Sequence, residues 1–258
     1  LYHSFLCNHA SVNVSWVHTD FVENHWSKRH FVENDEYKAY VSLDKLVFVS
    51  DYAKKQFAKV FDLPDKVKQY VCANFINVDE IMAKSLEPIN DIIKTKFTIC
   101  SVGRLEEVKG YDMVINAAKI LKERNIDVDF WILGTGSQEN LLKELLRQCQ
   151  CEDMVHFLGY KDNPYPYMKL ADVYLSSSYA EGLPLVLCEA QCLEMPIIAT
   201  KTIGALELLN NQKGAILIDL SADAIAEIVE FQKNNLNVLY SSKYENNNIN
   251  IVLDEILI

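Results

Sequence analysis

The sequence contains no apolar run long enough to span a bilayer, and its first residues do not resemble a signal peptide. It is also short of basic residues, because 25 Lys and Arg stand against 36 Asp and Glu, a formal net charge of −11. A chain of this charge repels phosphate backbones, which argues against general nucleic-acid binding. We therefore expect a cytoplasmic protein whose contact with a membrane, if it has one, is peripheral.

The seven cysteines are not arranged as a metal site. Cys149 and Cys151 flank Gln150, and Cys188 and Cys192 are one helical turn apart, but neither pair has a second Cys/His pair at zinc-finger spacing. Most of the cysteines lie in apolar runs, which is typical of buried, reduced thiols. We expect no metal in this protein.

Apolar residues are plentiful, at 50% of the chain, and they follow a regular order from Lys96 onward. Apolar strands alternate there with amphipathic helices, a pattern that predicts parallel β-α-β units in a doubly wound sheet. The predicted strands are 97–102, 128–133, 155–158, 173–176, 196–200 and 215–218. The predicted helices are 111–124, one that Ser137 caps and whose buried face includes Leu141, 185–193, 204–210, and one that Ser221 caps.

The first part of the chain shows fewer elements. Strands are predicted at 12–17, 46–49 and 67–71, with a helix that Ser50 caps and that packs through side chains including Val60. We expect residues 1–84 to be a partial N-terminal Rossmann-like domain and the polar stretch 85–96 to be a linker. Residues 97–220 form the second domain, and 221–258 a final helix and tail.

Several unusual residues follow predicted strands, where open parallel sheets bind ligands. Gly103 allows a sharp turn after its strand, and Arg104 and Lys109 bring two positive charges to the start of a helix, a suitable place for phosphate. The alternative is a solvated pair of cations beside Glu106 and Glu107.

Two more loops carry weaker or ambiguous signals. Gly134-Thr135-Gly136 could let the backbone approach a phosphate or sugar, or could be a plain tight turn. Glu189 lies in an otherwise apolar helix, where an unpaired carboxylate is costly. With Glu181 it could bind ligand hydroxyls, or both could form structural salt bridges.

The first part holds two further candidates. His18 follows a predicted strand among polar residues, and a lone histidine there is either structural or catalytic. Lys28, Arg29 and His30 lie near Trp26 and Phe31. This group could touch a membrane surface, or it could be a solvated helix face.

Together these motifs resemble glycosyltransferase family 4, a group of retaining enzymes with the two-domain GT-B fold, and in particular bacterial enzymes of capsule or lipopolysaccharide assembly. The match lies in the order and spacing of the motifs over 97–218, and 15–78 resembles the later part of the family's N-terminal domain. The matching motifs are Gly103-Arg104-Leu105, Lys109-Gly110, Leu133-Gly134-Thr135-Gly136, Phe157-Leu158-Gly159-Tyr160, Ala171-Asp172-Val173, Glu181 to Glu189, Pro196–Thr200, Gly204 and Glu207-Leu208-Leu209.

The resemblance implies a nucleotide-sugar donor, UDP- or GDP-linked, and a glycan or lipid-linked acceptor. It assigns catalytic roles to His18, Arg104, Lys109 and Glu181, and donor binding to Gly103, Arg104, Lys109, Gly134, Tyr160, Lys161, Glu181, Gly182, Leu183, Pro184, Leu185 and Glu189. Within that set the two cations would bind the diphosphate, backbone near Tyr160 and Lys161 the base, Glu189 the ribose, and Glu181 with the backbone of Gly182 to Leu185 the sugar. His18 would lie near the transferred sugar. No cofactor or metal is implied, because fixed cations and helix N–H groups can stabilise the departing diphosphate.

The sequence departs from the family pattern in several places. A Gly-rich loop of the N-terminal domain is missing, and Phe75, Ile203 and Gln212 replace a common proline and two common glycines. These departures favour one alternative, a donor-binding module without transfer activity. Two further alternatives are a nucleotide-sugar epimerase of the same fold and a glycosidase that uses Glu181 and Glu189 as its acid/base pair.

Overall fold

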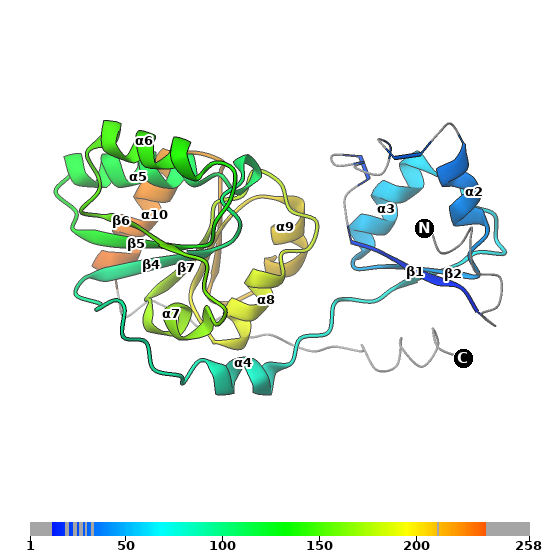
Figure 1. Cartoon of the computed structure of the whole chain (residues 1–258), viewed down its shortest axis with the longest axis horizontal. Helices are drawn as coiled ribbons and strands as arrows, with labels where there is room; N and C mark the ends of the chain where they lie inside the picture. Colours follow the sequence, from blue (N-terminus) through cyan, green and yellow to red (C-terminus); the bar gives the residue numbers. More distant parts are fainter. Residues whose placement is uncertain are drawn as a thin grey trace. The chain divides into compact units, whose positions relative to one another are not determined.

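The computed structural model describes residues 12–18, 21–22, 25, 28, 30–31, 34–210 and 212–235. The chain divides into two compact units, with the boundary between Phe75 and Ile76, and each unit has its own sheet (Figure 1). Trp26 and Arg29 of the predicted basic group, and the tail beyond Asn235, lie outside the described residues.

The first unit contains a parallel sheet of three strands in the order β1-β2-β3. The strands are β1 (Val14–Val17), β2 (Lys45–Phe48) and β3 (Lys68–Val71), and the helices are α2 (Asp35–Val41) and α3 (Asp51–Val60). The predicted cap of α3 is confirmed, because the Ser50 hydroxyl accepts the Ala53 N–H at 3.1 Å. The prediction that Val60 packs inward is wrong, since it is 38% exposed at the last turn. Phe21, Tyr40 and Phe57 fill the core instead.

The second unit contains six parallel strands in the order β6-β5-β4-β7-β8-β9. They are β4 (Phe97–Val102), β5 (Val128–Leu133), β6 (Val155–Gly159), β7 (Val173–Ser176), β8 (Ile197–Thr200) and β9 (Ala215–Ile218). The predicted doubly wound sheet is confirmed. The chain runs outward from β4 in one direction and then from β7 in the other, so the order reverses between these two neighbours. A crevice for ligands forms at such a switch point, at the carboxyl ends of the strands.

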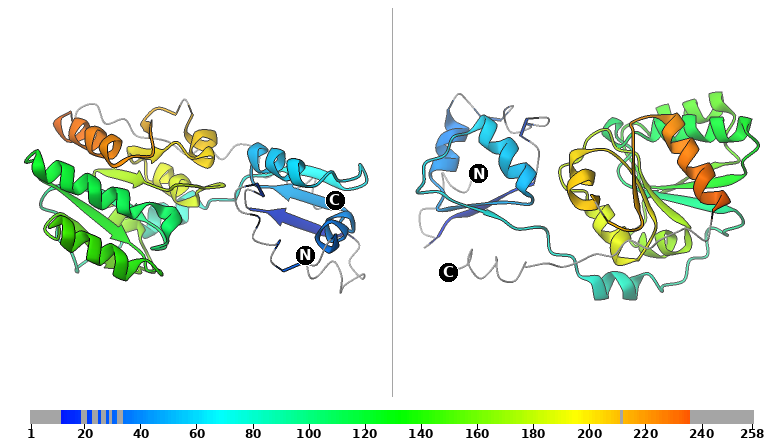
Figure 2. Two further views of the ribbon diagram at one scale, coloured as in Figure 1. Left: turned by 90° about the horizontal axis from the view of Figure 1, so that it is seen from above. Right: turned by 180° about the vertical axis from the view of Figure 1, so that it is seen from behind.

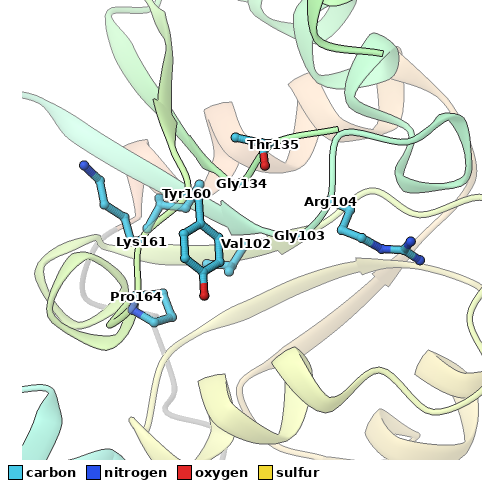
Figure 3. A pocket seen from close by; sticks show the side chains of 9 residues that line it. Val102, Gly103, Arg104, Gly134, Thr135, Tyr160, Lys161 and Pro164 are labelled. Atoms are coloured by element: carbon cyan, nitrogen blue, oxygen red, sulfur yellow. The ribbon is translucent and has the colours of Figure 1, made fainter. Parts of the chain in front are cut away.

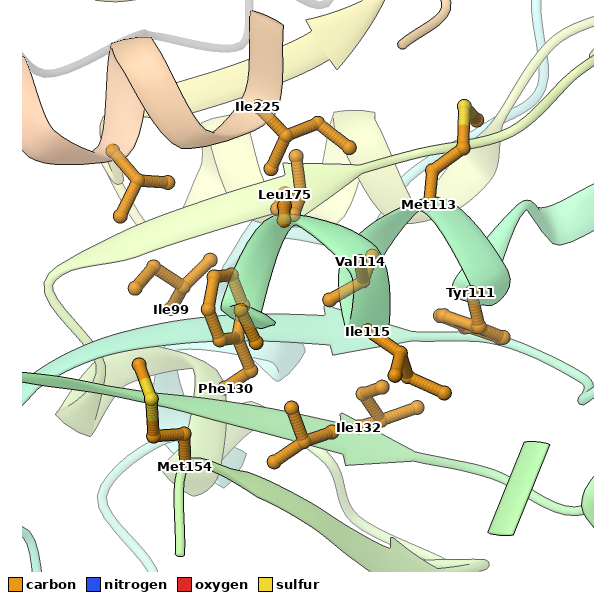
Figure 4. Packing of buried hydrophobic residues seen from close by; sticks show 14 of the residues in the cluster. Ile99, Tyr111, Met113, Val114, Ile115, Phe130, Ile132, Met154, Leu175 and Ile225 are labelled. Carbon is orange, nitrogen blue, oxygen red and sulfur yellow. The ribbon is translucent and has the colours of Figure 1, made fainter. Parts of the chain in front are cut away.

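Helices cover both faces of this sheet (Figures 1 and 2). One core lies under α5 (Tyr111–Glu123), α6 (Glu139–Cys149) and α10 (Ala222–Asn234), where Val114 and Ile115 pack toward Ile99, Phe130 and Ile132 (Figure 4). The opposite core lies under α4 (Val78–Lys84), α7 (Tyr165–Leu170), α8 (Leu185–Cys192) and α9 (Ile203–Leu209). A short 3-10 turn, η2 (Glu107–Lys109), precedes α5.

The two predicted caps in the second unit have different outcomes. Ser221 accepts the Ala224 N–H at 3.1 Å and caps α10 as predicted. Ser137 does not cap α6, because the helix begins at Glu139 after Gln138 and the Ser137 hydroxyl donates to Glu106 at 2.7 Å. Leu141, predicted on the buried face, is 65% exposed. The buried face of α6 is centred on Leu142 and Leu146, and Leu141 lies about 100° around the helix from its neighbour.

The segment between the units packs on the second one. Ile81 of α4 is buried in its core, and Ile89 and Ile92 pack against the same cluster. The Lys94 ammonium donates to Asp172 at 2.7 Å, and Asp172 also accepts the Thr98 N–H at the start of β4. The stretch that we predicted as a linker therefore lies within the second unit, and the boundary between units comes before α4 rather than after it.

Candidate functional site

Two loops meet at the switch point, one after β4 and one after β7. Their backbones touch, because a Cβ on Gly110 would lie 2.2 Å from the carbonyl oxygen of Ser177. Gly110 also has φ +63°, which favours glycine. The Ser177 hydroxyl donates to the carbonyl of Lys109 at 2.8 Å, and the Tyr179 N–H donates to that of Val108. The loops form one unit that presents Lys109 and Glu181 together.

Lys109 and Glu181 form an ion pair at this switch point. The Lys109 ammonium donates to Oε1 of Glu181 at 2.5 Å, and the side chains are only 19% and 16% exposed. The hydroxyl of Ser178, a residue 2% exposed, donates to the same oxygen at 2.7 Å. Thr200 in turn donates to the carbonyl of Ser178. The sequence assigned the cation and the carboxylate separate roles, and it gave no signal for their pairing or for Ser178.

Arg104 lies in the same loop after β4, and its side chain is exposed. Within the described part of the chain it forms no salt bridge. Its neighbour Glu106 is held by the side chain and backbone of Ser137, and these hydrogen bonds, with a smaller contribution from the charge of Arg104, lower the pKa of Glu106. The guanidinium is therefore available to an anionic ligand.

A pocket of about 230 Å³ adjoins Arg104. Figure 3 shows Tyr160 and Lys161 on one side of Gly103 and Arg104 on the other. The lining residues are Val102, Gly103, Arg104, Leu133, Gly134, Thr135, Tyr160, Lys161 and Pro164. Gly134 has φ +141°, and a Cβ there would lie 1.9 Å from the carbonyl oxygen of Gly103, so the pocket floor requires glycine.

The side chains of Tyr160 and Lys161 have different surroundings. Tyr160 is 69% exposed on the pocket wall. The Lys161 ammonium donates to Asp91 at 2.6 Å, and Tyr167 donates to the other oxygen of Asp91 at 2.7 Å. Because this cation is already paired, Lys161 offers the pocket its backbone and the stem of its side chain rather than a free charge.

Glu189 lies on α8 with its carboxylate half-buried. Burial raises its pKa, and a hydrogen bond from the Tyr165 hydroxyl to Oε1, at 3.2 Å, opposes that rise. Burial and the nearby Glu189 charge raise the pKa of Tyr165 to about 12. Tyr165 is a site residue that the sequence reasoning missed. The sequence does contain a signal for the helix that carries Tyr165. Asn163-Pro164 directly precedes it, and proline is common at the start of a helix such as α7.

The segment from Glu181 to Leu185 is held against α9. The Gly204 N–H donates to the carbonyl of Glu181 at 3.1 Å, and a Cβ on Gly204 would lie 2.4 Å from the carbonyl oxygen of Gly182. Pro184 precedes α8 without a side-chain cap, and the Leu187 N–H donates to the carbonyl of Pro184 at 3.0 Å, which leaves the N–H groups of Leu185 and Val186 without an intrahelical acceptor. These groups, which include that of Leu185 after Leu183 and Pro184, can bind an anion.

His18 lies in the first unit, directly after β1, and its side chain is exposed. Its catalytic role stays a prediction.

No group of three or more potential metal ligands occurs among the described residues. Asp127 and Asp129 do form an Asp-x-Asp spacing, which the sequence reasoning passed over. Both pair with Lys96 at the amino end of β5, opposite the end that carries the crevice. No helix in the described ranges is long and apolar enough to cross a membrane.

The chain matches known proteins over most of its length. A family model described as glycosyl transferases group 1 matches residues 83–245. A protein of Methanocaldococcus jannaschii named an uncharacterized glycosyltransferase is 29% identical over 168 residues, which cover 64% of this chain and 41% of that protein. A Campylobacter jejuni N-acetylgalactosamine-N,N'-diacetylbacillosaminyl-diphospho-undecaprenol 4-alpha-N-acetylgalactosaminyltransferase is 33% identical over 148 residues, 57% of this chain and 39% of that protein.

A solved structure of Anabaena HepE in complex with UDP and glucose has a TM-score of 0.77 at 17% identity, covering 95% of this chain and 70% of that one. This likeness confirms the predicted GT-B fold, with parallel α/β units. The matches to the Methanocaldococcus and Campylobacter proteins span less than half of each of those chains.

Proposed function

Because this chain belongs to the glycosyl transferases group 1 family, we propose that it transfers a sugar from a UDP- or GDP-linked donor to a glycan or lipid-linked acceptor, as a family 4 enzyme that retains the anomeric configuration. The observation that carries the proposal is the position of Arg104 and Lys109. Both cations follow β4 at the switch point of a parallel sheet. Arg104 lines the pocket beside Tyr160, and Lys109 precedes α5 and pairs with Glu181 in the loop before α8.

The donor diphosphate would lie between these cations. Breaking the bond between the anomeric carbon and phosphate leaves negative charge on the departing diphosphate. Arg104, Lys109 and the first N–H groups of α8 would stabilise that charge in fixed positions, without a metal. The acceptor hydroxyl oxygen would then bond to the anomeric carbon on the face from which the diphosphate departs. Its proton would pass to the departing diphosphate.

The rest of the donor has suitable partners nearby. The pocket beside Tyr160, at about 230 Å³, is smaller than the roughly 300–1,000 Å³ of drug-sized sites and suits one part of a ligand, the base. Glu189, on α8, would accept the ribose hydroxyls, which would justify a half-buried carboxylate. Glu181 and the backbone from Gly182 to Leu185 would hold the sugar.

The proposed acceptor and stereochemistry draw on the Campylobacter relative, whose name states a diphospho-undecaprenol acceptor and an alpha product. A lipid-linked acceptor would bring the enzyme to the inner face of the membrane. His18, in the first unit, is the catalytic candidate that rests on the family resemblance alone. Replacing it with alanine is expected to lower transfer while leaving donor affinity unchanged.

The alternatives differ in what they release. A donor-binding module would bind the nucleotide and release nothing, an epimerase would convert one nucleotide sugar into another, and a transferase would release nucleotide only with an acceptor. The glycosidase alternative is disfavoured because it would leave Arg104 and Lys109 without a phosphate to bind.

The donor site is tested by Arg104→Ala and Lys109→Ala. Each removes one charge-assisted contact with the diphosphate, and each is expected to weaken UDP or GDP binding by at least about tenfold. Isothermal calorimetry measures the affinities, with Lys119→Ala, an exposed lysine of α5, as the control. Unchanged affinity in both variants would contradict the assignment.

A further inference from the structure

The Glu181 carboxylate accepts a hydrogen bond from the Lys109 ammonium, the same group that a bound diphosphate would need. Lys109 donates to Glu181 at 2.5 Å, and both side chains are largely buried. An oxygen of a bound phosphate would sit about 2.8 Å from the same ammonium. The phosphate and the carboxylate would then lie within roughly 5 Å of each other and would compete for one cation.

The structure holds Glu181 in that competing position. Its Oε1 accepts from both Lys109 and Ser178, and its carbonyl accepts from Gly204. Ser178 is itself fixed through Thr200. Within the described residues, the second carboxylate oxygen, Oε2, has no hydrogen-bond partner. Glu181 therefore has one occupied oxygen and one that can still accept.

A nucleotide sugar and a free nucleoside diphosphate meet this carboxylate differently. The sugar brings hydroxyl groups that can donate to Oε2, and these bonds offset the repulsion between carboxylate and phosphate. The free nucleoside diphosphate brings no such donor, and it carries one more negative charge near Lys109 once the sugar has left. The repulsion is then unopposed.

We infer that Glu181 is a specificity-determining residue that favours the nucleotide-sugar donor over the nucleoside diphosphate product. The inference rests on the proposed function and adds a role for Glu181 in product release. The residue that helps hold the donor also weakens product binding, so that the product leaves after transfer.

The test is Glu181→Gln, which keeps the shape of the side chain and removes its charge. We expect it to bind UDP, or GDP if that is the nucleotide, about tenfold more tightly than the unaltered chain. Its affinity for the nucleotide sugar is expected to rise by no more than about twofold, because a neutral amide oxygen accepts from the sugar hydroxyls more weakly than the carboxylate does. Calorimetry without acceptor gives both constants, using UDP, GDP, UDP-glucose, UDP-N-acetylglucosamine and GDP-mannose.

Glu107→Gln is the matched control. Glu107 is exposed, lies two residues before Lys109, and forms no salt bridge with it. The change in net charge is identical, but the Glu107 carboxylate is exposed and screened by solvent, so the affinity of this variant for UDP should stay within about twofold. A second variant, Glu181→Ala, removes the charge without adding an amide and should also tighten product binding, while thermal melting establishes that each variant is folded.

The outcomes separate two failures. If the unaltered chain binds neither UDP nor GDP, the proposed function fails. If it binds one of them, but folded Glu181 variants bind it no more tightly or tighten donor and product equally, the role of Glu181 is overturned and the donor site stands.

Discussion

Single side chains decide what the crevice of the second unit can bind. Lys109 is paired, Arg104 is exposed, and Glu189 is half-buried with one hydroxyl donor, Tyr165. A carboxylate that is buried with so little support costs folding free energy, which is the pattern of a residue kept for a ligand. Stability and function should therefore respond in opposite directions when Glu189 is changed.

Glu189→Gln tests that opposition through its pH dependence. Burial raises the folded-state pKa of Glu189 above the ordinary 4.5, so the folded protein favours the protonated form. The contribution of this shifted pKa to the free energy of unfolding is fully present below the unfolded-state pKa of Glu189. It is lost as the pH rises through the folded-state pKa. Near neutral pH the glutamine variant should melt higher, by about 2–4 °C for each 1 kcal/mol recovered.

The difference in melting temperature should shrink as the pH falls toward 4.5, and nucleotide binding by the variant should weaken. Scanning calorimetry between pH 4.5 and 8 measures the first effect, and titration with UDP or GDP the second. A variant that melts below the unaltered protein at every pH would show that Glu189 has a structural role.

At the scale of elements, glycines set how closely the loops of the site approach. Gly110 joins the loops after β4 and β7, where a Cβ would lie 2.2 Å from a backbone oxygen. Gly159, at the end of β6, has a similar backbone with φ +72°, but a Cβ there would meet nothing within 4 Å. An alanine at either position would have a strained, left-handed backbone, but only at Gly110 would its Cβ also clash with a neighbouring backbone.

Gly159→Ala should therefore cost about 1 kcal/mol, the usual penalty for a left-handed backbone. Gly110→Ala should cost at least about 2–4 kcal/mol and should also displace Lys109, because the backbone of Ser177 must move. Urea unfolding gives the stabilities, and calorimetry with UDP or GDP the binding. Equal losses in the two variants would show that the contact between the loops is unimportant.

At the scale of the whole molecule, the two units have separate cores, and the proposed donor residues lie in the second one. The first unit contributes His18 to the proposal. The segment 76–96 belongs to the second unit through Ile81, Ile89 and Ile92, although its sequence is polar and charged. A fragment should therefore begin before α4.

A fragment of residues 76–245 is expected to fold and to bind UDP or GDP within about threefold of the full chain, because it keeps both cores and both cations. A fragment that begins at residue 97 should be unstable, since it exposes the surface that α4 and the following segment cover. Circular dichroism and calorimetry measure folding and binding, and the longer fragment with Lys109→Ala is the control. A loss of more than tenfold in the longer fragment would place part of the donor site in the first unit.

Local patterns in the sequence determined most of the second unit. The alternation of apolar strands and amphipathic helices predicted all six strands of its sheet, and hydroxyl residues before helices identified the caps Ser221 in this unit and Ser50 in the first unit. These features depend on residues close in the chain. The short helices α2, α4 and α7 were missed, because six or seven residues carry little periodicity, whereas the equally short α9 was predicted.

Only the tertiary structure decided how the site residues are combined. The sequence placed Arg104, Lys109, Glu181 and Glu189 after strands or on a helix, but the pairing of Lys109 with Glu181 joins residues 72 positions apart. The partner of Glu189, Tyr165, and the partner of Lys161, Asp91, also lie on separate elements. Such contacts depend on the order of strands in the sheet and on close backbone approaches such as that of Gly110, which no local pattern encodes.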